Sequence, residues 1–315
     1  MARRALGPAS LTVVQAVDRL GPAPFLVACS GGPDSLALAA ASAVVAARRD
    51  AGIRAIVVDH GLQPGSDQVA ADVVAQLHEK LVIPAQVVAI QVDRAGAGPE
   101  ADARTARYHA LGRAAEPTEQ ILLGHTLDDQ AETVLLGLAR GSGIRSLAGM
   151  PAQRGPFMRP LLGLRRDLTT QACREFGLQP WLDPHNADSR FARVRVRTAV
   201  LPTLEQQLGP GITEALARSA SLARADADFL DELAVAAAAD LVGPGLEVEA
   251  VATLPPPIAT RVLQSWLRES GAVDVTAVHV RAVWALVIDW HGQVGVDVPG
   301  ARISRVAGRL HADRL

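Results

Sequence analysis

The sequence predicts an α/β protein with a doubly wound parallel sheet, followed by a smaller C-terminal α+β domain. Three observations support this fold class. Short apolar runs alternate with longer segments of helical spacing in the first half of the chain. The length of 315 residues exceeds one ordinary small domain. Strand-like alternation with a Pro-Gly turn returns only near the C-terminus, in "QVGVDVPGARISRVAGRLHA".

The expected strands of the first domain are the runs "FLVACS", "IRAIVVDH", "AQVVAIQV" and "QILLGH". Each run is rich in Val, Ile, Leu or Ala and bounded by turn residues, which is typical of strands buried on both faces. The segments between them, Asp34–Arg49, Ser66–Leu81 and Pro99–Ala114, have helical spacing. The alternation indicates a parallel sheet covered on both sides, whose ligands bind beyond the carboxyl ends of its strands.

The pattern changes after the fourth strand. A helical run from Leu164 to Phe176 follows a proline-containing stretch, and we expect the catalytic domain to cover residues 1–208. Glycine and proline then interrupt the chain, and a long Ala-rich amphipathic pattern predicts a connecting helix within residues 209–241. Residues 242–315, with the helical pattern "VTAVHVRAVWALVIDW", form the small C-terminal domain.

Charge is segregated along the chain, although the formal net charge is only −2. Between Arg154 and Arg197 there are nine Arg against four acidic residues, a local excess of five positive charges. Such an excess suits a polyanionic partner, and a solvated, ion-paired surface is the alternative.

The two cysteines, Cys29 and Cys173, stand far apart with no C-x-x-C pair. They support neither a disulfide framework nor a zinc or iron-sulfur site, which fits a reducing compartment. No continuous apolar stretch of signal-peptide or membrane-span length is present. We therefore expect a cytoplasmic protein without a membrane partner.

The stretch "SGGPDS" lies between the first strand and the first helix. Gly31 and Gly32 allow a sharp turn and a close approach to a ligand, while the N–H groups of the helix start attract anions. Ser30 and Ser35 add hydroxyl groups, so the loop is suited to phosphate. Asp34 would repel phosphate unless a cation lies between them, which suggests Mg²⁺. The alternative is that Asp34 and Ser35 only cap the helix.

A second polar stretch, "GHTLDDQAET", follows the fourth strand. On a helix His125, Asp129 and Glu132 share one face, and Asp128 and Glu132 are also neighbours. No basic residue occurs from Gly124 through Ala139, so neutralisation must come from a metal, an ammonium substrate or a distant arginine. Acidic residues that merely suit the helix dipole are the alternative.

These motifs resemble a known family. S-G-G-P-D-S is similar to the signature of the N-type ATP pyrophosphatases, the PP-loop proteins, and H-x-x-D-D-Q-x-E-T resembles the pattern of their tRNA(Ile)-lysidine synthetases. The stretches "VVDHGL", "EADARTARYHAL", "RPLL" and "DPHNADSRFARVRVR" agree with that pattern over roughly residues 24–200. The chain departs from it at Val194, where the family usually has Asn.

The resemblance implies adenylation of the C2 oxygen of the wobble cytidine in an isoleucine tRNA with a CAU anticodon. Lysine then displaces AMP to give lysidine. The implied ATP-binding residues are Ser30, Gly31, Gly32, Pro33, Asp34, Ser35, His60, Arg104 and Arg107. Mg²⁺ is assigned to Asp34 and Asp129, lysine to Asp129 and Glu132, and His125 lies closer to the reacting base. The catalytic set is therefore Asp34, His125, Asp129 and Glu132.

The expected tRNA-binding residues are Asn186, Arg190, Arg193, Arg195 and Arg197. In an extended chain Arg193, Arg195 and Arg197 would share a face, whereas in a helix Arg190, Arg193 and Arg197 would align. The C-terminal domain is expected to help bind the tRNA. A homodimer is one possible assembly.

Three alternatives remain at this point. A 2-thiolating PP-loop enzyme is the nearest, but such enzymes typically use paired cysteines or an iron-sulfur cluster. Amide-forming GMP or NAD synthetases are disfavoured because no amidotransferase-like nucleophile block is evident. A non-catalytic adenine-nucleotide-binding protein would gain nothing from four acidic groups at the sheet edge.

Overall fold

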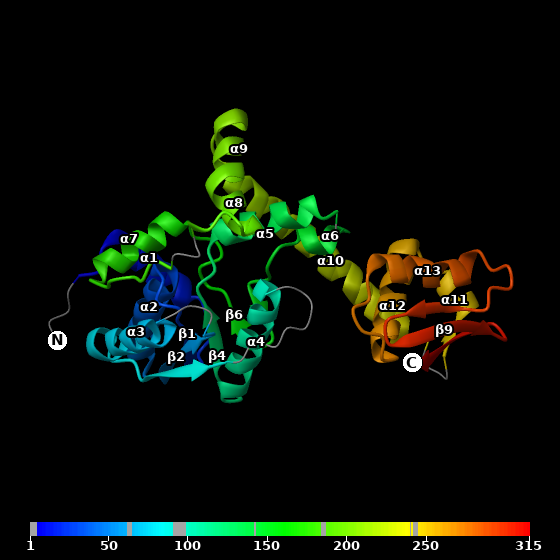
Figure 1. Ribbon diagram of the computed structural model, residues 1–315, viewed down its shortest axis with the longest axis horizontal. Helices are drawn as coiled ribbons and strands as arrows, with labels where there is room; N and C mark the ends of the chain where they lie inside the picture. Colours follow the sequence, from blue (N-terminus) through cyan, green and yellow to red (C-terminus); the bar gives the residue numbers. More distant parts are fainter. Residues whose placement is uncertain are drawn as a thin grey trace. The chain divides into compact units, whose positions relative to one another are not determined.

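The computed structural model describes residues 5–61, 65–90, 99–141, 143–183, 187–239, 241 and 245–315. The chain forms two compact units, Met1–Ala223 and Arg224–Leu315, and the long helix α10 (Ile212–Ala239) belongs to both (Figure 1). Asn186, one of the expected tRNA contacts, lies outside the described residues.

The first unit is built around a six-stranded sheet with the order β3-β2-β1-β4-β6-β5. All neighbouring strands are parallel except β5 and β6, which are antiparallel. The strands are β1 (Phe25–Ala28), β2 (Ile53–Asp59), β3 (Ala85–Ala89), β4 (Gln120–Leu123), β5 (Gln153–Arg154) and β6 (Phe157–Met158). The four predicted apolar runs are β1 to β4, so the predicted fold class is confirmed.

Helices cover both faces of this sheet because side chains of a strand point alternately to its two faces. Phe25 and Val27 of β1 pack into the core beneath α1, α2, α3 and α7, whereas Leu26 packs with Leu111 of α4 on the other face (Figure 1). The helices on the first face are α1 (Pro8–Asp18), α2 (Pro33–Arg49), α3 (Ser66–Leu81) and α7 (Arg166–Glu175), and α4 is Pro99–Ala114.

The edge strand β3 differs from the prediction. It was expected to be buried on both faces, but three of its five residues are exposed, Val87 among them at 41%. The prediction is wrong here because a strand at the edge of a sheet has a neighbour on one side only, which periodicity along the chain does not reveal.

The remaining helices of the first unit gather after β4. They are α5 (Leu127–Ala139), α6 (Gly143–Leu147), α8 (Ala192–Arg195), a π-helical turn (Val196–Val200) and α9 (Leu201–Leu208). The π-helical turn joins α8 to α9, and its Val196 packs against Ala131 of α5. This turn therefore sets how the arginines of α8 approach α5.

The second unit contains a four-stranded antiparallel sheet with the order β7-β10-β9-β8. Its elements are β7 (Leu246–Glu247), α11 (Val248–Ala252), α12 (Pro256–Glu269), α13 (Ala277–Ile288), β8 (Val296–Val298), β9 (Ala301–Val306) and β10 (Arg309–Arg314). Leu263 of α12 and Val283 of α13 pack with Ile303 of β9 in its core. The predicted small α+β domain is confirmed. No helix in the described parts of either unit is long and apolar enough to cross a membrane.

Candidate active site

The loop after β1 makes a sharp turn that only glycine accommodates. Gly31 has a φ of +81°, and a Cβ atom there would lie 2.4 Å from Cγ2 of Val73. The helix α2 then begins at Pro33, and its N-cap residue Gly32 offers no side chain to the first N–H groups. These N–H groups are therefore available to an anion at the carboxyl edge of the sheet.

The two serines of the loop have different surroundings. Ser35 is buried, and its hydroxyl donates to the carbonyl oxygen of Gly32 at 2.9 Å while accepting from the N–H of Ser30 at 3.2 Å. Ser35 thus holds the loop in shape from within. Ser30 is exposed, so its hydroxyl can reach a ligand.

Asp34 does not cap its helix. Its Oδ1 accepts a hydrogen bond from the hydroxyl of Thr169, and its Oδ2 lies 3.6 Å from Nε of Arg166. Burial raises the pKa of Asp34 to about 6, with nearby Asp129 contributing in the same direction and Thr169 and Arg166 opposing it. The structure therefore favours the functional interpretation of Asp34 over the capping one.

The two motifs meet at Gly124, directly after β4. A Cβ atom there would lie 3.2 Å from Cα of Ser35 and 3.2 Å from the carbonyl carbon of Asp34. The close backbone approach follows from the parallel pairing of β1 with β4, which brings their carboxyl ends side by side. The phosphate loop and the acidic helix α5 thus form one site.

The two carboxylate oxygens of Asp129 have different partners: one caps the helix α5 and the other contacts arginines of the site. Its Oδ2 accepts from the N–H of Thr126 at 2.8 Å, while Thr126 caps α5 in return. Its Oδ1 lies 2.8 Å from a terminal nitrogen of Arg166 and 3.5 Å from one of Arg197. Burial opposes ionisation of Asp129, but Arg166 is the strongest of several favourable contacts, and the pKa is lowered.

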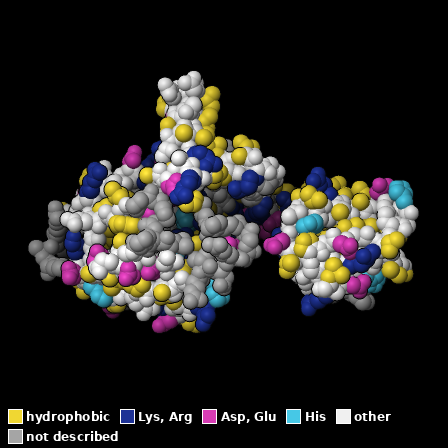
Figure 2. All heavy atoms as spheres, in the orientation of Figure 1, with side chains coloured by type: hydrophobic (Ala, Val, Ile, Leu, Met, Phe, Trp, Pro, Cys, Tyr) yellow, Lys and Arg dark blue, Asp and Glu magenta, His cyan; other side chains and the backbone are white. Residues whose placement is uncertain are grey.

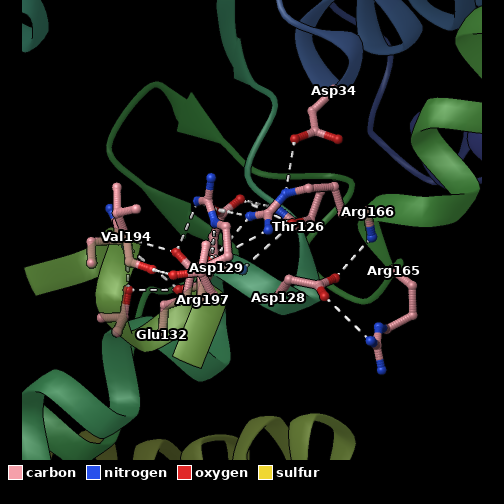
Figure 3. A network of polar contacts seen from close by, with 12 residues as sticks. Asp34, Thr126, Asp128, Asp129, Glu132, Arg165, Arg166, Val194 and Arg197 are labelled. Atoms are coloured by element: carbon pink, nitrogen blue, oxygen red, sulfur yellow. Dashed lines mark hydrogen bonds and ion pairs between the residues drawn. The ribbon is translucent and has the colours of Figure 1, made fainter. Parts of the chain in front are cut away.

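Glu132 is fully buried and surrounded by arginines (Figure 3). Nε of Arg197 lies 2.7 Å from Oε1, Nε of Arg193 lies 3.1 Å from Oε2, and Arg166 NH1 lies 3.3 Å from Oε1. The sequence left open whether a metal, an ammonium substrate or a distant arginine neutralises this carboxylate, and in the structure arginines distant in sequence do so.

Arg166 was missed by sequence reasoning, although it joins the two motifs. It contacts Asp34, Asp129 and Glu132 at once. The sequence did contain a signal, because Arg165 and Arg166 stand at the start of α7. Positive charge there is unfavourable next to the helix dipole, which indicates that these arginines have acidic partners outside their own helix.

Asp128 connects the start of α5 to the start of α7. Its Oδ2 accepts from the backbone N–H of Arg166 at 2.8 Å, and its Oδ1 lies 3.3 Å from Arg165. Arg165 also pairs with Glu214 of α10 at 2.6 Å. These contacts fix the helix that presents Arg166 to the site (Figure 3).

His125 is neutral in this site. Burial lowers its pKa to about 3, against the attraction of Asp129 and with help from the positive charges of Arg107, Arg104 and Arg159. Burial and Arg107 likewise lower the pKa of His60. Arg104 and Arg107 therefore lie within electrostatic reach of His125, directly before α5, and His60 lies within reach of Arg107.

The expected tRNA-binding arginines point in two directions. The segment is helical from Ala192, so Arg193 and Arg197 share a face, and they point inward to Glu132 instead of forming an exposed stripe. Arg190 is exposed beside Asp188, and Arg195 is also exposed. Figure 2 shows Lys and Arg side chains gathered over α8, at the base of α9.

Val194 and the two cysteines are buried. Val194 stands at the position where the resemblance calls for Asn, and it is 6% exposed. Burial raises the pKa of Cys29, and burial with nearby Cys29 and Asp34 raises that of Cys173 to about 11. Neither thiol is suited to act as a thiolate nucleophile or metal ligand.

Comparison with known proteins agrees with the motifs. Residues 9–204 match the family description "PP-loop domain", and residues 246–311 match "TilS substrate binding domain". A tRNA(Ile)-lysidine synthase of Leifsonia xyli subsp. xyli is 50% identical over 90% of this chain and 88% of its own length. One of Cutibacterium acnes is 47% identical over 100% of this chain and 99% of its own.

A solved structure shares the fold alone. It is the U34-tRNA thiolase NcsA from Methanococcus maripaludis with its [4Fe-4S] cluster, with a TM-score of 0.57 and 19% identity. The similarity covers 69% of this chain and 78% of that one.

Proposed function

The chain belongs to the tRNA(Ile)-lysidine synthase family of PP-loop proteins, and on this premise we propose that it ligates lysine to C2 of the wobble cytidine of an isoleucine tRNA. ATP is converted to AMP and pyrophosphate in the process. The observation that supports the proposal is the close backbone approach at Gly124, which brings the loop after β1 next to the start of the acidic helix α5.

In the first step the C2 oxygen of cytidine attacks the α-phosphorus of ATP, and the bond to pyrophosphate breaks. The free N–H groups at the start of α2 and the hydroxyl of Ser30 stabilise the charge of the departing pyrophosphate. Neutral His125 can donate a hydrogen bond to the reacting base without repelling a cation.

The carboxylates of Asp34 and Asp129 fit Mg²⁺, which prefers oxygen ligands and is bound in proteins by one or two carboxylates together with substrate phosphates. Both carboxylates already share one cationic partner, Arg166, at 3.6 Å and 2.8 Å. When bound, the ion would neutralise the triphosphate and polarise the bond to pyrophosphate.

In the second step the lysine amine attacks C2, the C2–O bond breaks, and AMP leaves with that oxygen. The amine must first lose a proton, because its ordinary pKa is near 10. We assign the removal of that proton to one of the carboxylates that hold the ammonium group.

Lysine recognition is assigned to Asp129 and Glu132, acting differently. Asp129 Oδ1 is the carboxylate oxygen that can meet the ammonium group, whereas Glu132 holds Arg166 and Arg197 in place. A cavity of about 140 Å³ beside them is lined by Glu132 and by Arg166 and Arg197, the two arginines that contact Asp129, but not by Asp129 itself. That volume equals about four or five waters, comparable to the five heavy atoms of a lysine side chain.

Binding of the tRNA is assigned to the exposed Arg190 and Arg195, to Asn186 and to the second unit, which matches the substrate-binding domain. Arg193 and Arg197 contribute by shaping α8. The 2-thiolation alternative is disfavoured because both cysteines are buried with raised pKa values.

The test combines the full chain with ATP, lysine and an isoleucine tRNA transcript carrying a CAU anticodon. We expect AMP release only when both tRNA and lysine are present, because lysine displaces AMP in the second step, and a wobble nucleoside whose mass increases by lysine minus water. Glu79→Gln, an exposed carboxylate on α3, is the matched control for Asp34→Asn. AMP release without tRNA, or an unmodified nucleoside, would contradict the proposal.

A further inference from the structure

A second group of charged side chains lies between α4 and β6, and the reaction described above leaves most of it unused. We call it the arginine recess: Arg104, Arg107, Tyr108, His125 and Arg159. The hydroxyl of Tyr108 accepts from Arg159 at 3.0 Å and from Arg104 at 3.2 Å. The guanidinium groups of Arg104 and Arg107 lie 5.1 Å and 5.9 Å from the centre of the Tyr108 ring.

Several buried nitrogen atoms of this recess lack a hydrogen-bond partner among the described residues. Nε of Arg107, Nε of Arg159 and Nδ1 of His125 are all buried and make no hydrogen bond there. Arg159 is only 4% exposed, and one terminal nitrogen of its side chain donates to the carbonyl oxygen of Pro151 at 2.9 Å. Within the same described part of the chain, no carboxylate pairs with Arg107 or Arg159.

Such an arrangement is costly unless a ligand completes it. Buried donors without acceptors lose the hydrogen bonds they had in water, and like charges repel one another at short range. Burial and then Arg104 are the main causes that lower the pKa of Arg107, and neighbouring arginines help keep His125 neutral. Tyr108 already accepts two hydrogen bonds, so its own hydrogen is free for a third group. An anion would satisfy Arg107, Arg159 and Tyr108 together.

The acidic and basic parts of the site suit different anions. A triphosphate arrives with Mg²⁺, for which Asp34 and Asp129 are available. Arg107 and Arg159 have no paired carboxylate among the described residues, so this part of the recess suits a singly charged group that carries no metal. Three separate donor side chains also exceed what one carboxylate needs, since a single arginine can hold a carboxylate through two hydrogen bonds.

We propose that the arginine recess binds a phosphodiester group of the RNA substrate next to the reacting cytidine, with Arg107, Arg159 and Tyr108 as its donors. This inference rests on the proposed function for the identity of the RNA. It adds Arg159 and Tyr108 to the substrate-binding residues and gives Arg107 an RNA phosphate in place of the ATP phosphates. The flanking phosphate would hold the base in position for attack on ATP.

The experiment measures binding without catalysis. The full chain is titrated with a fluorescent anticodon stem-loop of the CAU tRNA, and separately with the same RNA carrying uncharged methylphosphonate linkages on either side of the wobble cytidine. The variants are Arg107→Gln, Arg159→Gln and Tyr108→Phe, of which the last keeps the ring packed on Phe157. Arg113→Gln, exposed on the same helix, is the control.

We expect Arg107→Gln and Arg159→Gln to weaken binding of the normal stem-loop about tenfold and to reduce its salt slope by about 0.7. Tyr108→Phe should weaken it about threefold, the effect of one modest hydrogen bond. Against the methylphosphonate RNA these variants should bind like the original chain. Affinity for ATP, measured by equilibrium dialysis, should change less than twofold.

Three results would overturn the inference. These are unchanged stem-loop affinity in Arg107→Gln and Tyr108→Phe, a loss of ATP affinity in place of RNA affinity, and equal losses for the normal and methylphosphonate RNAs. The proposed function is judged separately, by lysidine formation in the original chain. If the original chain forms lysidine but the variants bind the stem-loop as it does, only the proposal for the recess is rejected. If the original chain forms no lysidine but the variants show the expected binding losses, only the proposed reaction is rejected.

Discussion

Replacing Asp34 by Asn is expected to abolish ligation while making the free protein more stable. Burial raises the pKa of this carboxyl from 3.8 to about 6, so the charged form is disfavoured in the folded chain. A shift of about two units corresponds to about 3 kcal/mol. Asn keeps the shape and still accepts from Thr169, while Arg166 retains Asp129 and Glu132 as partners.

The pH dependence has a defined sign. Because the folded pKa of Asp34 is raised, the folded chain binds more protons than the unfolded chain between pH 3.8 and about 6, and its stability falls as pH rises through that window. The penalty is complete above pH 6 and absent below pH 3.8. Asp34→Asn should therefore gain about 3 kcal/mol at pH 7.5 and almost nothing near pH 4.

Scanning calorimetry at pH 7.5 and pH 4 provides the measurement. Asp34 belongs to the first unit, so the transition of the second unit is an internal control, and Glu79→Gln controls for the loss of a surface carboxylate. A variant that unfolds at a lower temperature than the original chain at pH 7.5 would refute the reasoning. A gain that is the same at both pH values would refute it as well.

Three further predictions concern other parts of the first unit. Glu205 accepts backbone and hydroxyl hydrogen bonds from Thr213, which lower its pKa to about 2, so Glu205→Gln should lower the melting temperature above pH 4.5 with a deficit that disappears toward pH 2. Glu132→Ala should cost about 3–5 kcal/mol in urea unfolding, because it leaves three partly buried arginines without the fully buried carboxylate that they share; a loss under 1 kcal/mol would contradict this. Gly31→Ala should abolish ATP binding in equilibrium dialysis, and adding Val73→Ala should remove the clash but not the backbone strain, leaving binding only partly restored.

The order of strands and helices was predictable because periodicity is a local property. The exposure of β3 was not, since it depends on which strand ends the sheet. The helix α1 was not predicted either. Its start is held by the carboxylate of Glu175, which accepts from the N–H of Ser10 at 2.7 Å. The two residues are 165 positions apart in the sequence. No pattern within α1 points to that partner.

The site was predictable where its motifs are short and was missed where its contacts are distant in sequence. The loop at Gly31 and the helix with Asp129 each lie within a few residues of a strand end. Arg166, in contrast, has partners on α2 and α5, and only the folded chain brings these together. The inward direction of Arg193 depends likewise on the helical conformation of α8, one of two geometries that the sequence allowed.

Charge complementarity within the first unit explains why one pocket can run two steps with opposite needs. The carboxylates of Asp129 and Glu132 are paired with Arg166 of α7 and with Arg197 of the π-helical turn. A small cation can therefore bind by replacing one of these arginines at a carboxylate that is already neutralised. Arg107 and Arg159 have no such carboxylate among the described residues and leave positive charge for an anion. This division would hold the lysine amine at the carboxylates and the RNA phosphate at the arginines, on different sides of the reacting base. The amine would then be kept from forming an ion pair with the phosphate of the RNA that it must attack.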